Sequence, residues 1–133
     1  MWITRQIKTV MLIAGVLTST MIYAAVAPQA ALVSTFGEGL EGPVAEIVVR
    51  NWGALIALVG AMLIYGAFTP LHRRLVLTVA GVSKAIFIAL VLSNGNRFLS
   101  YQAGVAVVVD SLFVILFVLY LAVPTSRQSS PAA

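Results

Sequence analysis

Apolar residues dominate four long segments of this chain, and polar residues gather in the stretches between them. The apolar segments cover about residues 9–27, 51–68, 75–93 and 104–123, and the second could begin as early as Val44. A helix needs about 20 apolar residues to cross the hydrocarbon core of a membrane. Backbone in lipid must satisfy its own hydrogen bonds, and no segment shows the alternation of a membrane β-strand. The pattern predicts an all-α, integral membrane four-helix bundle in a single domain, residues 1–123.

Prolines mark the ends of these segments: Pro28, Pro43, Pro70 and Pro124 all lie at boundaries. A proline ring cannot continue a helix from within, so this placement supports the four spans. The last stretch, residues 124–133 ("PTSRQSSPAA"), is small and polar. We expect it to be a disordered tail.

The first apolar segment has features of a secretory signal. Arg5 and Lys8 precede it, and "AVA" at Ala25 to Ala27 resembles a cleavage site. However, the run of 19 residues exceeds the 7 to 15 that are typical of such signals. Pro28 follows the candidate site directly and fits an extended protease substrate poorly. We expect the segment to be retained as a membrane span.

Composition supports a membrane protein over a soluble one. Hydrophobic residues make up 61% of the chain and charged residues only 9%, with a mean hydropathy of +1.05. Soluble domains carry about a quarter charged residues. The net charge of +4 would suggest a nucleic-acid partner in a soluble protein. Here the basic residues lie between apolar runs, so a topological role explains them and no nucleic-acid partner is expected.

The absence of cysteine narrows the chemistry further. It excludes disulfides, thiol redox reactions, cysteine nucleophiles and zinc–thiolate sites. Quinone-linked disulfide chemistry, a common role of small four-helix membrane proteins, is excluded with them. We find no nucleophile–base constellation and no cofactor ligand, which favours a protein that is not an enzyme.

Charges in the connections predict the orientation. Five basic residues lie on one side of the predicted membrane: Arg5, Lys8, Arg73, Arg74 and Arg127. The other side holds two basic residues and three acidic ones: Arg50, Arg97, Glu38, Glu41 and Glu46. Because positive loops stay in the cytoplasm, the bias predicts an N-in/C-in, multi-pass protein of the bacterial cytoplasmic (inner) membrane. Both termini and the tail would then be cytoplasmic.

The connection between the first two spans, residues 28–51, is the longest. It mixes apolar residues with three glycines and three glutamates, which suits a segment lying at the outer interface. Glu46 and Arg50 stand four apart, the favourable helical order for an exposed ion pair. We favour an extension of the second helix above the membrane over a ligand site. A metal site is not expected, because His72 lies on the opposite side from the glutamates and their spacing matches no metal motif.

Lys84 and Asp110 are charges inside predicted spans. Lys84 lies about 13 Å below the outer end of the third span, and Asp110 about 9 Å below that of the fourth. These depths agree within about one helical turn, and a charge at mid-membrane costs about 2.5 to 3.5 kcal/mol on insertion scales. We therefore predict a Lys84–Asp110 ion pair.

Small residues at intervals of four give these helices a predicted packing face. One stripe runs beside Lys84 and another follows the second span: Gly81, Ala85 and Ala89, and Gly53, Ala57 and Ala61. Such stripes mark close helix–helix contacts, so we expect Lys84 to face the bundle interior. Ser83 and Ser111 are nearby polar residues that could join the same hydrogen-bond set.

Two interpretations of the pair remain open. It could simply clip the third helix to the fourth, or it could form a polar site, open to the outer face, for proton coupling or a small polar or anionic ligand. A further arrangement pairs Asp110 with Arg50 or Arg97 and leaves Lys84 free to lose its proton.

Several features of the chain are similar to those of a known family: its size, its four spans, its orientation, the entry "VRNWGALIALVGAMLIYGA" to the second span and the lysine in "VSKAIF". In these features the chain resembles the small bacterial inner-membrane proteins of the DoxX-like kind. The resemblance covers most of the chain but transfers no catalytic residue. It implies a mostly uncharacterised family, some of whose members are linked to quinone-dependent sulfur oxidation or to partner enzymes.

Two other families of this size fit less well. The first span lacks the glutamate of small multidrug-resistance exporters, and "SNGNRF" lacks the glycine-asparagine and phenylalanine pattern of fluoride channels.

These observations predict an accessory or structural subunit of a membrane complex, with the lipid bilayer and either a homo-oligomer or a larger assembly as partners. The first alternative is a small-solute or proton-coupled transporter that uses Lys84 and Asp110. The second is a subunit of a quinone-associated oxidoreductase. No cofactor is predicted.

Overall fold

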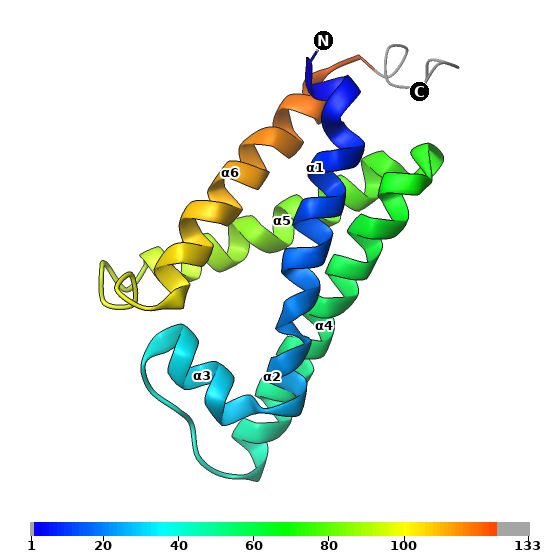
Figure 1. Cartoon of the computed structure of the whole chain (residues 1–133). Helices are drawn as coiled ribbons and strands as arrows, with labels where there is room; N and C mark the ends of the chain where they lie inside the picture. Colours follow the sequence, from blue (N-terminus) through cyan, green and yellow to red (C-terminus); the bar gives the residue numbers. More distant parts are fainter. Residues whose placement is uncertain (1, 125–133) are drawn as a thin grey trace.

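The computed structural model describes residues 2–124, and this part of the chain is helical without a β-strand (Figure 1). The predicted disordered tail therefore lies, apart from Pro124, outside the described residues. In chain order the elements are α1 (Trp2–Ser19), the 3-10 turn η1 (Thr20–Ile22), α2 (Tyr23–Val26), α3 (Pro28–Phe36), α4 (Pro43–Phe68), the 3-10 turn η2 (Pro70–His72), α5 (Arg73–Leu92) and α6 (Gln102–Ala122).

Four helical stretches within residues 2–124 are long and apolar enough to cross a membrane: Trp2–Val26, Pro43–Phe68, Pro70–Leu92 and Gln102–Ala122. They confirm the four predicted apolar helices and indicate a multi-pass membrane protein. The first begins at Trp2 rather than near residue 9, so it includes the basic residues Arg5 and Lys8. The second begins at Pro43, close to the earlier of the two predicted starts.

The two ends of the bundle are built differently (Figure 1). The end that carries Trp2, η2 and Pro124 is called the terminal end here. The opposite end, which carries α3 and residues 93–101, is called the loop end. The long predicted connection at the loop end is largely helical, since it contains α3 and the first turns of α4.

Helices α1 and α4 approach each other at backbone distance. A Cβ built on Gly60 would lie 2.5 Å from the backbone N of Ser19 and 2.8 Å from the carbonyl O of Gly15. A Cβ on Gly53 would lie 2.8 Å from the backbone N of Ala25 in α2, the short helix that follows α1 and η1. Only glycine fits such contacts, which are typical of closely packed membrane helices.

The contact face of α4 differs from the predicted stripe in its direction. Gly53 is buried, but Ala57 is half-buried and Ala61 is exposed, while the buried face continues through Gly60 and Ala67. With 3.6 residues per turn, a step of four residues drifts by about 40° around the helix, whereas a step of seven nearly closes two turns. The buried small residues of α4 therefore follow intervals of seven.

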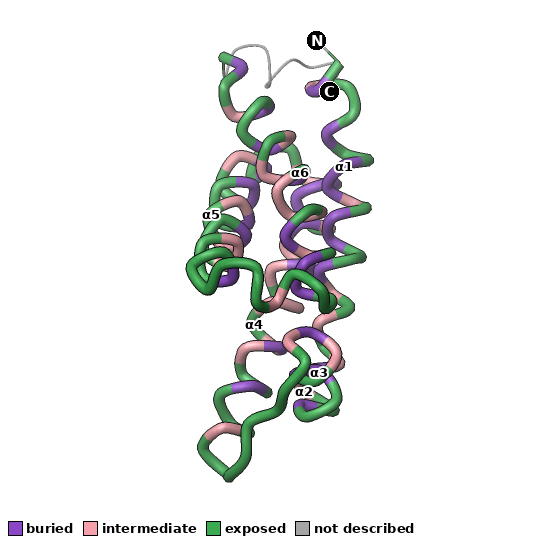
Figure 2. The backbone as a smooth tube through the Cα atoms, turned by 90° about the vertical axis from the view of Figure 1, so that its left-hand side faces the viewer, coloured by how far each residue is buried: buried purple, intermediate pink, exposed green. Residues whose placement is uncertain are grey.

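The buried core lies mainly between α1, α4, α5 and α6. Its most enclosed large side chains are Ile7, Met11, Leu63, Leu77 and Phe117. Buried and exposed positions alternate along the helices (Figure 2), and the exposed positions include many large apolar side chains, among them Leu58, Val82, Leu90, Val105 and Val108. An apolar exterior of this extent is the expected outer surface of a helix bundle in lipid.

A short helix, α3, lies at the loop end. Pro28 opens it at a position where the missing N–H costs nothing, and Gly37 ends it in the left-handed conformation at φ 82°. Phe36 joins α3 to the neighbouring elements, because its ring lies 6.1 Å from that of Trp52 and 5.4 Å from that of Phe98. α3 thus packs against the bundle rather than forming a free linker.

Candidate functional site

The structure brings Lys84 and Asp110 into direct contact. Lys84 projects from α5 and Asp110 from the adjacent, antiparallel α6, and Lys84 Nζ lies 2.9 Å from Asp110 Oδ1. The lysine side chain is 8% exposed and the aspartate side chain 19% exposed. The contact is therefore an enclosed ion pair, not a surface one.

A third helix contributes to the same site. Lys84 Nζ donates a hydrogen bond of 3.0 Å to Oγ1 of Thr18 on α1, and Thr18 is itself buried. The ring of Phe113, one turn beyond Asp110 on α6, lies with its centroid 5.7 Å from the ammonium, within the range of a cation–π contact. The ammonium is thus held between α1, α5 and α6.

These contacts offset the cost of burying the charge. A buried ammonium is tolerated only when a carboxylate and further hydrogen bonds replace its water. Among the described residues, no buried side-chain nitrogen or oxygen lacks a hydrogen-bond partner. The site is a satisfied polar cluster inside an apolar bundle.

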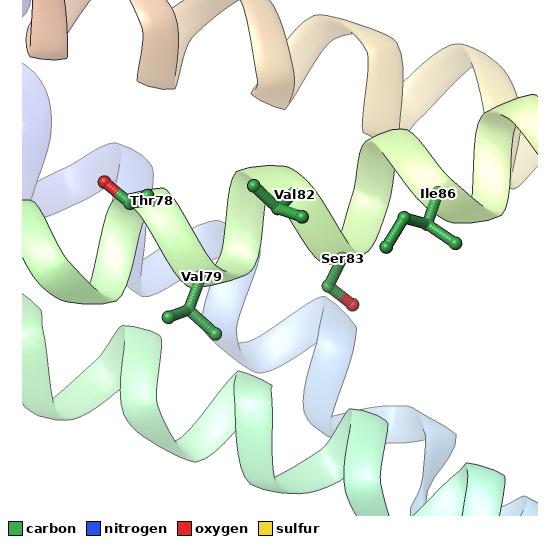
Figure 3. A pocket seen from close by; sticks show the side chains of 5 residues that line it. All are labelled: Thr78, Val79, Val82, Ser83 and Ile86. Atoms are coloured by element: carbon green, nitrogen blue, oxygen red, sulfur yellow. The ribbon is translucent and has the colours of Figure 1, made fainter.

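Ser83 lies on another side of α5. It lines a shallow depression of about 430 Å³ on the exposed face of the helix, together with Thr78, Val79, Val82 and Ile86 (Figure 3). Consecutive helical residues point about 100° apart, so Ser83 cannot share the direction of Lys84. Ser83 therefore does not join the hydrogen bonds of the Lys84 ammonium, as the sequence had suggested it could.

Ser111 follows Asp110 on α6 and is half-buried. The hydrogen bonds of the Lys84 ammonium go instead to Asp110 and to Thr18. Sequence reasoning considered the two serines next to the charges along the chain and missed the threonine on a distant helix.

The small-residue stripe beside Lys84 faces mainly outward. Gly81 is half-buried, while Ala85 and Ala89 are exposed. Lys84 is buried, as expected, but it continues a different face of α5, which includes the buried residues Leu77 and Ala80. The small residues of the stripe and Lys84 are neighbours in sequence, but they lie on different faces of α5.

The arginines at the loop end have other partners than Asp110. Arg50 Nη2 lies 2.8 Å from Glu46 Oε1, and Arg97 Nη2 lies 3.0 Å from Glu38 Oε1. Both pairs are exposed, and the spacing of the first is the predicted one. The structure thus shows Asp110 with Lys84, and the arrangement with a free lysine is not the one present.

At the terminal end, two arginines cap the C-termini of helices, a role that sequence reasoning missed. Buried Arg73 donates through Nε to the carbonyl of Gly66 at 3.1 Å and through Nη2 to that of Ala67 at 2.8 Å, at the end of α4. Arg74 Nη2 donates to the carbonyl of Leu121 at 3.0 Å, at the end of α6. The last carbonyls of a helix lack intrahelical donors and carry partial negative charge, so a guanidinium stabilises them.

In residues 2–124 no group of three or more histidine, aspartate or glutamate side chains is arranged to hold a metal ion. The site instead offers one ammonium–carboxylate pair, one hydroxyl and one aromatic ring within a helical bundle of membrane-spanning length. Comparison of the chain with models of protein families, with curated proteins and with solved structures finds no match.

Proposed function

We propose that this chain is an accessory or structural subunit of a membrane complex, inserted in the bacterial cytoplasmic membrane. One observation carries the proposal. The Lys84 side chain is only 8% exposed, its ammonium is engaged by both Asp110 and Thr18, and neither residue of the ion pair lines a described depression. A site for solute or cofactor needs access and free polar groups, whereas this arrangement joins three helices.

The orientation that we propose has both ends of the chain in the cytoplasm. The terminal end carries Arg5, Lys8, Arg73 and Arg74 and no carboxylate side chain, since the three glutamates belong to the loop end and Asp110 pairs with Lys84. This asymmetry is the one that the positive-inside rule associates with the cytoplasmic side. The likeness to DoxX-like proteins, some of which serve partner enzymes, agrees with an accessory role.

The proposal is tested by what accompanies the protein when it is purified from native membranes in mild detergent. We expect a defined partner protein in constant ratio. The double variant Lys84→Met with Asp110→Leu removes the whole ion pair and should retain that partner, since in this proposal the pair acts on the fold alone. Purification of the parent protein without a partner would contradict the proposal. Loss of the partner in a folded double variant would contradict only the statement that the ion pair acts on the fold alone.

Transport is the second candidate, and one observation favours it. Asp110 is more exposed than Lys84, at 19% against 8% of the side chain, so one side of the carboxylate reaches the surface of the bundle. Protein reconstituted into vesicles with an internal pH dye would reveal proton coupling. A flux present in the parent protein and absent in the folded double variant would favour transport over the accessory role.

A further inference from the structure

Asp110 has one carboxylate oxygen that the ion pair does not use. Oδ1 accepts the hydrogen bond from Lys84, whereas Oδ2 accepts none from any described residue. Every enclosed side-chain nitrogen or oxygen in residues 2–124 has a partner, so Oδ2 is not enclosed, in line with the 19% exposure of the side chain. Because an ionised carboxylate accepts hydrogen bonds on both of its oxygens, Oδ2 has unused capacity for a donor within the span.

The hydroxyl of Thr18 has an unused hydrogen. Its oxygen accepts the bond from Lys84 Nζ, but the hydroxyl donates to no acceptor among the described residues. A helical hydroxyl commonly donates to a carbonyl of its own helix, as that of Thr78 does to Arg74 at 2.8 Å. Thr18 makes no such bond, although it is buried. The cluster therefore holds one unpaired donor on α1 and one unpaired acceptor on α6.

A molecule that joins these two groups must be small. Lys84 Nζ lies 2.9 Å from Asp110 Oδ1 and 3.0 Å from Thr18 Oγ1. Since the N–H bonds of an ammonium diverge tetrahedrally, these two oxygens stand about 5 Å apart, and one water with hydrogen bonds of about 2.8 Å to each of two oxygens spans about the same distance. None of the three residues lines a described depression that could take a larger solute.

We propose that the cluster of Lys84, Asp110 and Thr18 binds one water molecule. The water accepts a hydrogen bond from the Thr18 hydroxyl and donates one to Asp110 Oδ2, and it thereby joins α1 to α6. Together with the two bonds of Lys84, it closes a ring of hydrogen bonds through three helices. Bound water of this kind satisfies polar groups that the protein itself leaves unpaired. The inference goes beyond the accessory role and does not depend on it.

Residue-specific isotope labelling provides a direct test, because Asp110 is the only aspartate of the chain. Cell-free synthesis with aspartate that carries carbon-13 at its carboxyl group labels this site alone. The protein is inserted into phosphatidylcholine bilayers with deuterated acyl chains, and solid-state NMR follows the transfer of magnetisation from water protons to the label. We expect transfer within the same mixing time as for the exposed carboxyl groups of Glu38 and Glu46, which are labelled in a parallel sample.

Matched variants locate the water. Thr18→Val removes the donor at nearly constant shape and should abolish most of the transfer, whereas Thr18→Ser keeps the hydroxyl and should retain it. Ser111→Ala removes the hydroxyl that follows Asp110 on α6 but makes no hydrogen bond in the cluster, and it should leave the transfer unchanged. The dipolar coupling between nitrogen-15 in Lys84 and the carbon-13 label shows in each sample whether the ion pair is intact.

Absence of transfer to Asp110 in the parent protein overturns the proposal. Transfer that survives Thr18→Val, or that is lost in Thr18→Ser or Ser111→Ala, overturns it as well, because the water would then lie elsewhere or depend on packing alone. So does loss of the dipolar coupling to Lys84 in Thr18→Val, since the carboxylate would then have moved away. Transfer that follows the hydroxyl at position 18 while the ion pair stays intact supports the proposal.

Discussion

Lys84 depends on two side chains of different character. Asp110 supplies the opposite charge from the neighbouring helix, and Thr18 supplies a hydroxyl from a helix that is distant in sequence. Their contributions differ in kind, because loss of the carboxylate leaves a net charge in the bundle, whereas loss of the hydroxyl leaves one hydrogen bond unmade. Substitutions at the three residues should therefore form a graded series.

The ion pair should show strong coupling. Lys84→Met alone leaves the Asp110 carboxylate enclosed without its counter-charge and should lower the free energy of unfolding by about 3–5 kcal/mol. Lys84→Met with Asp110→Leu removes both charges and should restore stability to within about 1 kcal/mol of the parent. Unfolding in mixed micelles, followed by circular dichroism, measures both values. The exposed pair Arg97 and Glu38 is the control, with single changes expected below about 1 kcal/mol. Equal losses in the single and double variants would argue against the pair as a structural clip.

The hydroxyl of Thr18 should contribute less, but measurably. Thr18→Val keeps the shape of the side chain and removes the acceptor of the Lys84 hydrogen bond, which should cost about 1–2 kcal/mol in the same unfolding measurement. Thr78→Val is the matched control, because that hydroxyl is exposed and donates to the carbonyl of Arg74 in its own helix. A cost at Thr18 no larger than that at Thr78 would show that the contact between α1 and α5 contributes little.

Sequence reasoning could pair Lys84 with Asp110 because both charges are rare in spans and their depths can be counted from the span ends. Thr18 stands nine residues before the predicted end of its span, which gives the same depth of about 13 Å as Lys84. Sequence reasoning missed it because a threonine costs little free energy to place in a membrane span, so its presence there does not by itself indicate a partner. Applying the depth count to hydroxyl groups would have identified it.

At the scale of elements, the positions of the four long helices could be predicted well. The side of each helix that contacts its neighbours could not. Length and hydropathy determine where a span can lie, and prolines near its ends limit the error. The direction of a face depends on which neighbours a helix meets, and the small residues Ala61, Ala85 and Ala89 are exposed although they continue stripes from Gly53 and Gly81. Small residues are compatible with close packing, but they do not require it.

The contact of α1 with α4 gives a sharp test at this scale. Gly60→Ala places a methyl group 2.8 Å from the carbonyl O of Gly15 and should lower the free energy of unfolding by about 1–3 kcal/mol through overpacking. Gly81→Ala is the matched control, since its Cβ would meet nothing nearer than 3.9 Å, at Phe117. That variant should be neutral or stabilising by up to about 1 kcal/mol, because alanine favours a helix. Similar effects of the two substitutions would contradict the backbone-close contact.

At the scale of the whole molecule, charge distinguishes the two ends. The terminal end is positive, and the loop end holds all three glutamates with two arginines paired to them. This asymmetry could be predicted, since it depends only on the order of charges and spans. The packing of α3 against the loop end could not, because it depends on the ring contacts of Phe36 with residues from two other segments.

The proposed orientation can be measured with single cysteines, because the chain has none of its own. Gln6 at the terminal end and Ser100 at the loop end are both exposed and provide the labelling positions. In intact spheroplasts, a membrane-impermeant maleimide should label Ser100→Cys and leave Gln6→Cys unmodified, whereas permeabilised cells should show both labelled. The reverse pattern would invert the orientation, and labelling of both in intact cells would indicate dual topology.

The position of Thr18 on the first helix has a consequence for the order in which the protein is made. Synthesis completes α1 long before α5, whereas Asp110 follows Lys84 by 26 residues and emerges only with α6. A lysine entering the membrane with α5 therefore arrives before its counter-charge, and the hydroxyl of Thr18 is the partner already waiting for it. We therefore expect the hydrogen bond between α1 and α5 to hold the ammonium during this interval, so that the earliest helix assists the insertion of a later one.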